Sequence, residues 1–129
     1  MRNLILLIGA LLELTSVGMG TYIDHGLSHH VDLKTLSMPK TALLYHQLYA
    51  VMISVIGFYL HSQKNLLFKI AAWVFIIGSS LFSFSIYLTA ITGIVIFTKL
   101  TPMGGIMLMI AWLLLAYAAF YHTKKSISK

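Results

Sequence analysis

The sequence contains no cysteine and few charged residues, and both absences exclude whole classes of protein. Without cysteine, the chain can form no disulfide, no thiolate metal site and no cysteine nucleophile. Charged residues make up only 9% of the chain and hydrophobic residues 59%, proportions that lie well outside the range of soluble globular domains. The sequence therefore predicts a protein that folds within a lipid bilayer.

Four long apolar runs occupy most of the 129 residues. They cover residues 4–23, 42–60, 70–98 and 100–121. Crossing the hydrocarbon core of a bilayer takes roughly 20 apolar residues in a helix, and a helix is favoured because lipid offers no partners for unpaired backbone groups. We predict an all-α integral membrane four-helix bundle, a single domain over residues 1–129, with the lipid bilayer as its surroundings. The predicted spans are residues 4–23, 42–60, 70–92 and 102–121.

The ends of the runs carry most of the basic residues, and these predict the orientation. With four spans, six basic residues fall on the side of the termini: Arg2, Lys64, Lys69, Lys124, Lys125 and Lys129. Three fall on the other side: Lys34, Lys40 and Lys99. Cytoplasmic segments carry an excess of Lys and Arg, so both termini are predicted to be cytoplasmic. The basic residues form no recognition stripe, and we expect no nucleic-acid partner despite the net charge of +6.

Details within the runs refine this picture. The first run contains Glu13 and has no clear small-residue cleavage pattern, so we expect a retained helix and not a cleaved signal peptide. The third run is longer than one span needs: either its helix ends at Thr92-Gly93 and leaves residues 94–98 as an interfacial turn, or a longer helix tilts in the bilayer. Pro102 suits the first turn of the last helix. The outward connection covers residues 24–41, and within it residues 28–40 are expected to form a solvated loop with room for a short surface helix.

Small and polar residues recur on one face of each of the first three spans. In lipid, helices associate through such residues, because small side chains let two backbones approach closely. The faces are Gly9, Glu13, Ser16 and Gly20; His46, Ala50, Ser54 and Gly57; and Ser79, Ser83, Tyr87 and Ala90. We expect these faces to meet one another. The glycines predicted to mediate helix packing are Gly9, Gly20, Gly57, Gly104 and Gly105.

Glu13 is the most informative single residue. It lies near the middle of its span, where an ionised carboxylate is costly unless it is paired, and no span contains Lys or Arg. We expect a neutral carboxyl group that is hydrogen-bonded to a serine, threonine or tyrosine of a neighbouring helix, or open to trapped water. The alternatives are a proton- or cation-binding role for Glu13 and a carboxyl group that faces the lipid without a role.

The histidines near the outer end allow two interpretations. His25 and His29 would share a helical face suited to a divalent metal, but Gly26 intervenes and the spacing matches no established metal motif, so we predict no metal site and no cofactor. The favoured interpretation is a hydrogen-bonded pair, His25 and His46, that closes the outer end of the bundle.

The order of several short motifs resembles a known family. These motifs are His25-Gly26-Leu27 after a glycine-rich first helix, Tyr45-His46, Phe82 to Tyr87, Thr101-Pro102-Met103-Gly104-Gly105, and Trp112. Together they resemble domain of unknown function 423, which includes bacterial YgdD-like membrane proteins and is related to eukaryotic transmembrane protein 256. The resemblance covers the whole chain and implies four transmembrane helices, a multi-pass location in the bacterial inner membrane, and no established function. This chain departs from the family pattern at Ile23 and Asp24, where small residues are usual, and at Phe84, where glycine is usual.

Three functions remain open at this point. The first is a non-enzymatic accessory or structural protein that acts through helix contacts with itself or with a larger membrane complex. The second is binding or transport of a small molecule, proton or ion through a polar site. The candidate residues for that site are Glu13, Asp24, His25, His46, Ser83 and Tyr87. The third is an intramembrane hydrolase, for which Ser83 with His46 is the one conceivable pair of nucleophile and base. We favour the first and expect no catalytic residues.

Overall fold

A computed structural model describes residues 4–129, and Arg2 of the predicted topology lies outside the described residues. The chain forms four long helices: α1 (Leu4–Thr21), α2 (Leu33–Ser62), α3 (Leu66–Thr92) and α4 (Leu100–Ile127). All four helical stretches are long and apolar enough to cross a membrane, and the described part of the chain contains no strand. The predicted all-α architecture with four spanning helices is therefore confirmed.

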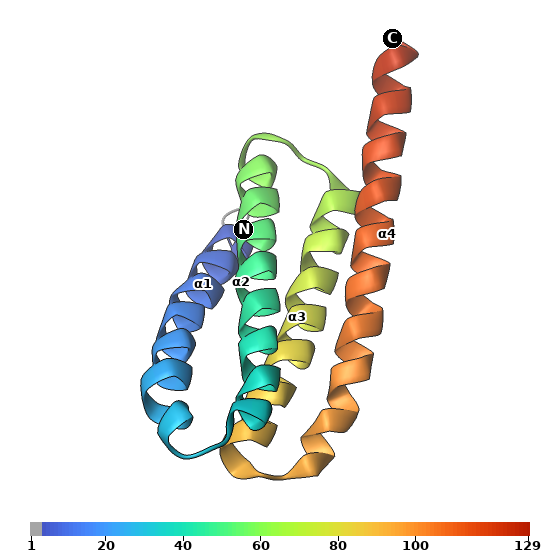
Figure 1. Ribbon diagram of the computed structural model, residues 1–129. Helices are drawn as coiled ribbons and strands as arrows, with labels where there is room; N and C mark the ends of the chain where they lie inside the picture. Colours follow the sequence, from blue (N-terminus) through green and yellow to red (C-terminus); the bar gives the residue numbers. More distant parts are fainter. Residues whose placement is uncertain (1–3) are drawn as a thin grey trace.

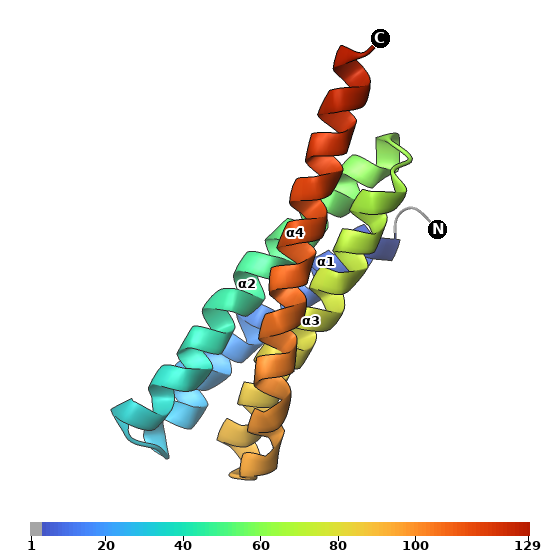
Figure 2. The same ribbon diagram turned by 90° about the vertical axis from the view of Figure 1, so that its right-hand side faces the viewer.

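The helices pack in the order of the sequence and not as a closed square. The main packing contacts join α1 to α2, α2 to α3, and α3 to α4, and α1 and α4 lie at opposite ends of the row (Figure 1; Figure 2 shows the row from its α4 side). In an 18-residue apolar stretch of each span, 39% is buried inside the protein for the spans of α2 and α3. The buried share is only 17% for the span of α1 and 22% for the span of α4. The two outer helices therefore present most of their apolar surface to the surroundings.

The connection between α1 and α2 is shorter and more helical than predicted. A π-helical turn, η1 (Tyr22–Gly26), and a 3₁₀ turn, η2 (Leu27–His29), extend α1, and α2 begins at Leu33, before the predicted residue 42. The reason is local: the Asp32 side chain accepts a hydrogen bond from the Thr35 backbone N–H at 3.1 Å and so caps α2. The solvated loop predicted for residues 28–40 is thus wrong from Leu33 onward, where α2 has already begun.

α3 ends at Thr92, which agrees with the first of the two predicted alternatives and not with a longer tilted helix. Gly93 has a φ of +71° at the C-terminal end of α3, a left-handed conformation that glycine adopts without steric cost. A 3₁₀ turn, η3 (Val95–Lys99), then leads into α4. Pro102 lies in the first turn of α4, where its missing N–H leaves no hydrogen bond unmade.

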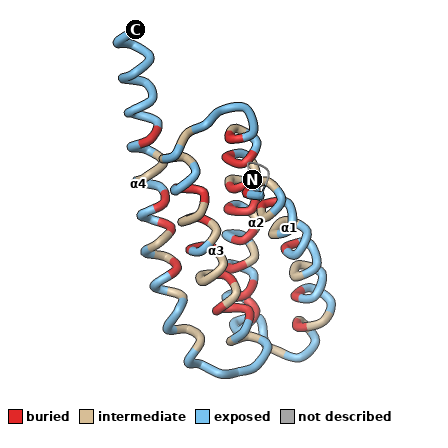
Figure 3. The backbone as a smooth tube through the Cα atoms, turned by 180° about the vertical axis from the view of Figure 1, so that it is seen from behind, coloured by how far each residue is buried: buried red, intermediate tan, exposed pale blue. Residues whose placement is uncertain are grey.

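The buried residues form two clusters along the row, visible as red segments in Figure 3. One lies toward the end where α1 begins and includes Ile5, Ile53, Phe75 and Leu108. The other lies toward the α1–α2 connection and comprises Ile23, Leu27, Leu36, Ala42, Ile86 and Tyr87. The C-terminal part of α4 projects beyond the other helices (Figure 1), and every residue after Ala118 is exposed.

Candidate functional site

His46 joins three helices through a directional chain of hydrogen bonds. Its Nδ1 lies 3.1 Å from the Tyr87 hydroxyl of α3, and its Nε2 lies 3.5 Å from Thr15 Oγ1 of α1. The Thr15 hydroxyl donates to the carbonyl oxygen of Leu12 at 2.8 Å, which leaves its oxygen to accept from Nε2–H. A neutral histidine with its proton on Nε2 satisfies both contacts, because Nδ1 then accepts from the Tyr87 hydroxyl. The chain is complete and ends at a backbone carbonyl.

The surroundings of His46 are aromatic and tightly packed. The imidazole is 3% exposed, and the Phe84 ring meets it edge-on with 5.3 Å between ring centroids. Ser83, one turn before Tyr87 on α3, donates to the carbonyl oxygen of Ala42 at 3.1 Å. Ser83 is therefore hydrogen-bonded to the α2 backbone, and both nitrogens of His46 have other partners.

The predicted hydrogen bond between His25 and His46 is wrong. His25 is exposed in η1, whereas His46 is buried between α1 and α3. The cause is the helical register: Ile23 and Leu27 take the buried positions, and His25 lies midway between them on the other face. Tyr87 provides the hydrogen bond that was expected from His25.

Asp24 also faces solvent. Its carboxylate lies 3.6 Å from Lys40 Nζ on α2, and both side chains are more than half exposed. An ion pair of this kind contributes between zero and about 1 kcal/mol. Among residues 4–129, no group of three or more His, Asp or Glu side chains is placed to hold a metal ion.

Glu13 lacks the interhelical hydrogen bond that the sequence predicted. Its Oε2 is buried and has no hydrogen-bond partner among the described residues. The nearby hydroxyls are already committed to their own helices: Ser16 donates to the Glu13 carbonyl at 2.7 Å and Ser54 to the Ala50 carbonyl at 2.8 Å. Beside the carboxyl group, α1 and α2 form a shallow groove of about 360 Å³. Its lining residues are Leu6, Glu13, Val51, Ser54, Val55 and Phe58.

Three of the predicted packing glycines lie where two helix backbones meet. A Cβ added at Gly9 would lie 2.8 Å from the Ser54 nitrogen, one at Gly57 would lie 2.6 Å from the Leu6 nitrogen, and one at Gly104 would lie 2.5 Å from the Phe82 nitrogen. Gly20 is less crowded, since its nearest neighbour would be a Leu43 methyl group at 3.3 Å. At Gly105 the nearest atom would be 4.0 Å away, so this contact does not require glycine.

Sequence reasoning missed several residues that join the helices. Nothing in the sequence marked Thr15 or Tyr49 as contact residues, because each is a common residue in an apolar run. Tyr49 accepts a hydrogen bond from Trp112 Nε1 at 3.1 Å and so links α2 to α4. Gly78 opposes Gly104, and a Cβ there would lie 3.2 Å from the Leu108 nitrogen. Gly78 lies four residues before Phe82 and so on the same face of α3. This spacing could have identified Gly78 as a contact residue, because one face of α3 must approach α4.

Comparison with known proteins places the chain in a family. Residues 19–105 match the family described as "Protein of unknown function (DUF423)". The chain is 31% identical to the UPF0382 membrane protein YwdK of Bacillus subtilis (strain 168) over 115 residues, 88% of this chain and 94% of the relative. It is 32% identical to a UPF0382 membrane protein of Haemophilus influenzae over 121 residues, 93% of this chain and 96% of the relative. No solved structure matches.

These matches confirm the resemblance drawn from the motifs between His25 and Trp112. The matched segment contains His46, Ser83, Tyr87 and Gly104, although the relatives' names assign none of them a role. The described residues form four helices suited to a membrane, and the two relatives, both named membrane proteins, match the chain over almost their whole length. The chain therefore belongs to the DUF423 family of membrane proteins, a family of unknown function.

Proposed function

We propose that this protein is a non-enzymatic accessory protein of the bacterial inner membrane that associates with a further transmembrane helix along the groove between α1 and α2. The association partner is a second copy of the chain or a subunit of a larger membrane complex. The observation that carries the proposal is the Glu13 carboxyl group, which lines that groove and whose buried Oε2 has no hydrogen-bond partner among the described residues.

The environment of Glu13 explains why a partner helix is favoured. Hydrocarbon supplies no hydrogen-bond donor, so a buried oxygen without a partner is costly in a bilayer. A helix that carried a hydroxyl, amide or other donor would remove that cost on docking. Polar contacts of this kind contribute to helix association in membranes.

The arrangement of the helices supports the same proposal. Because α1 packs mainly on α2, its far side and the adjacent surface of α2 are open. Val55 and Phe58 are 59% and 71% exposed there. An incoming helix would pack on these apolar side chains while it reached Glu13.

The hydrogen bonds around His46 support a non-enzymatic role. A serine nucleophile requires a base within hydrogen-bond reach. Neither His46 nitrogen is bonded to Ser83, whose hydroxyl donates to Ala42. The same arrangement is well suited to holding α1, α2 and α3 together.

Proton or ion transport is the second candidate, and the row of hydrogen bonds from Tyr87 through His46 to Thr15 favours it. Its support is weaker because that row ends at the Leu12 carbonyl, which carries no exchangeable proton. Among the described residues, no hydrogen bond joins the Glu13 carboxyl group to this row of hydrogen bonds. His25, the predicted outer member of such a path, is exposed and separate.

Site-directed cross-linking in native membranes tests the proposed association. The natural chain has no cysteine, so Val55→Cys carries a single attachment point for a photoactivatable maleimide reagent beside the groove. The matched control is Leu113→Cys on α4, which is 71% exposed and lies on the outer helix at the other end of the row.

We expect Val55→Cys to give adducts of defined mass and Leu113→Cys to give only background. Adding Glu13→Leu to Val55→Cys should remove most of the adduct, whereas adding Glu13→Gln should retain it, because glutamine keeps a hydrogen-bond donor and acceptor. An adduct at twice the chain mass identifies a second copy, and another mass identifies a different subunit. Equal labelling from both cysteines, or labelling that Glu13→Leu leaves unchanged, would contradict the proposal.

A further inference from the structure

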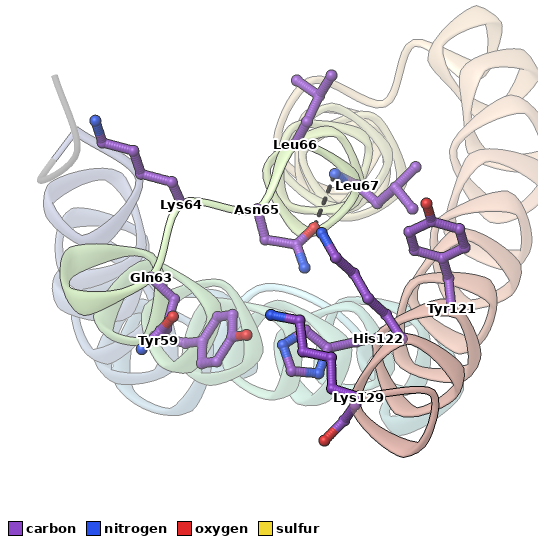
Figure 4. Close-up of a pocket in the computed structure, with 11 residues that line it drawn as sticks. Tyr59, Gln63, Lys64, Asn65, Leu66, Leu67, Tyr121, His122 and Lys129 are labelled. Atoms are coloured by element: carbon purple, nitrogen blue, oxygen red, sulfur yellow. Dashed lines mark hydrogen bonds between the residues drawn. The ribbon is translucent and has the colours of Figure 1, made fainter.

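The end of the molecule that carries the C-terminus has a basic hollow beside the α2–α3 connection. The hollow has a volume of about 480 Å³ and lies between that connection and the projecting part of α4 (Figure 4). Lys64, Lys125 and Lys129 line it together with the polar side chains of Gln63, Asn65 and His122. Its remaining walls are largely apolar or aromatic, including Tyr59 and Tyr121.

The register of α4 places its lysines toward this hollow. The buried residues of α4 are Gly104, Leu108, Ala111 and Ala118, a stripe with spacings of four, three and seven that faces α3. The same spacing continues beyond the bundle as His122, Lys125 and Lys129. The face that packs on α3 within the bundle is therefore the face that lines the hollow above it.

A second hollow lies on the other side of the same connection. Its volume is about 510 Å³, and it includes Lys64 and Lys69 together with the apolar side chains of Ile5 and Leu60. Gln63, Lys64, Asn65 and Leu66 line both hollows. The connection is thus a narrow polar segment with lysines on either side.

No acidic side chain balances these lysines. The chain contains three acidic residues: Glu13 lies within α1, and Asp24 and Asp32 lie at the opposite end of the helices. An electropositive hollow with polar donors and apolar walls, at the end of membrane-spanning helices, matches the place where lipid phosphates lie.

We propose that the hollow beside the α2–α3 connection binds the headgroup of an anionic phospholipid. Lys125 and Lys129 contact the phosphate, and Asn65 donates through its side-chain amide, whose oxygen already accepts from the Leu67 and Phe68 backbone N–H groups. The aromatic rings of Tyr59 and Tyr121 flank the start of the acyl chains. The apolar walls favour a lipid over a free phosphate ion, which would gain nothing from them.

A topology signal alone makes a different prediction. Lysines that only orient the chain during insertion act through their number on one side of the membrane, and their effect ends once the protein is inserted. A binding site acts through particular lysines and persists in detergent solution, where the two sides of a membrane no longer exist. Lipid binding by the purified protein therefore separates the two roles.

The test compares a double variant in the hollow with a matched double variant at the other end. Lys125→Gln/Lys129→Gln removes two charges from the hollow, and Lys34→Gln/Lys99→Gln removes two from the opposite end. All four lysines are exposed, and Ala118 is the last buried residue of α4, so neither pair supports the core. Purified full-length proteins in a neutral detergent are titrated with phosphatidylglycerol or phosphatidylcholine, and bound lipid is counted by native mass spectrometry.

We expect phosphatidylglycerol to bind the wild-type protein and the Lys34/Lys99 variant equally, and phosphatidylcholine to bind both weakly. A lysine near a lipid headgroup changes affinity by about fivefold, so the Lys125/Lys129 variant should bind phosphatidylglycerol about 25-fold more weakly. Single Lys125→Gln should weaken binding by about fivefold and serves as a second variant. Equal binding by the two double variants, or equal binding of the two lipids, would overturn the proposal. Inorganic phosphate that displaces the lipid at millimolar concentration would overturn the assignment to a lipid and identify a soluble anion as the ligand.

Discussion

The Tyr87 hydroxyl lies 3.1 Å from Nδ1 of His46, and this contact joins the third helix to the second at a point that the first helix also reaches through Thr15. The pair lies in the interior, where His46 is 3% and Tyr87 2% exposed. It provides the polar contact that fixes the register of three helices in an environment where apolar packing alone discriminates poorly between registers.

Tyr87→Phe should therefore destabilise the protein. The substitution removes the donor to Nδ1 and leaves a buried nitrogen without a partner, at a cost of about 0.5–2 kcal/mol in the free energy of unfolding. Thermal unfolding in detergent measures the change. Tyr121→Phe is the matched control because Tyr121 is exposed on α4; equal effects of the two substitutions would show that the His46 contact contributes nothing.

The sequence predicted the helices well and the polar contacts only in part. Apolar run length predicted the four spanning helices, because the bilayer sets how many residues a span needs. Hydrophobicity did not reveal the start of α2 at Leu33, since a local cap at Asp32 determines it. The pairing of His46 with Tyr87 and not with His25 depends on rotation about the helix axis near η1. The π-helical turn η1 changes that rotation, and no residue pattern in the sequence predicted the turn.

The glycines provide a graded test of backbone contact. Gly104→Ala should destabilise the protein by about 1–3 kcal/mol, because the new methyl group would lie 2.5 Å from the Phe82 nitrogen and 2.8 Å from the Gly78 oxygen. Gly105→Ala, at the next position, should be neutral or slightly stabilising, because its nearest neighbour is 4.0 Å away and alanine favours a helix. Chemical or thermal unfolding of the two variants checks this order. Equal losses would mean that α3 and α4 are farther apart than the structure places them.

Glu13 is expected to reduce the stability of the isolated chain. Replacing it with leucine removes a buried oxygen that has no partner among the described residues, so Glu13→Leu should leave the unfolding temperature in detergent unchanged or raise it. Ser83→Ala, which deletes an interhelical hydrogen bond to Ala42, should lower it. A marked loss of stability in Glu13→Leu would indicate a partner for the carboxyl group within the chain.

Glu13→Gln separates the two candidate functions. If Glu13 acts through helix association, glutamine should preserve both the fold and the growth of a strain that lacks the wild-type protein, under acid or ionic stress. If Glu13 carries protons or a cation, the same variant should fold normally and fail to complement. A stable glutamine variant that behaves like the deletion would therefore favour transport.

Asp32 gives a pH-dependent prediction outside the spans. Its hydrogen bonds with Thr35 hold the pKa of this exposed carboxyl below its ordinary value. The sign follows: the carboxylate's contribution to stability is complete above the unfolded-state pKa and is lost as the pH falls through the folded-state pKa. Asp32→Ala should lower the unfolding temperature at neutral pH, and the difference from the wild type should shrink in acid. Asp32→Asn keeps an N-cap acceptor and should show little of this pH dependence. A loss in Asp32→Ala that is constant from neutral to acidic pH would contradict the role of the ionised carboxylate.

The orientation in the membrane follows from the charge at the two ends. Lys64, Lys69 and the lysines of the α4 C-terminus gather at one end, so we expect this end to be cytoplasmic. A reporter active only in the periplasm should be silent when fused after Lys129 and active when inserted at His30, between η2 and α2. Because the excess of basic residues is only six to three, replacing Lys64, Lys69, Lys124 and Lys125 with glutamine should reverse the bias and give mixed or inverted reporter signals. Periplasmic activity of the unmodified chain at Lys129 would invert the assignment and place the basic hollow in the outer leaflet.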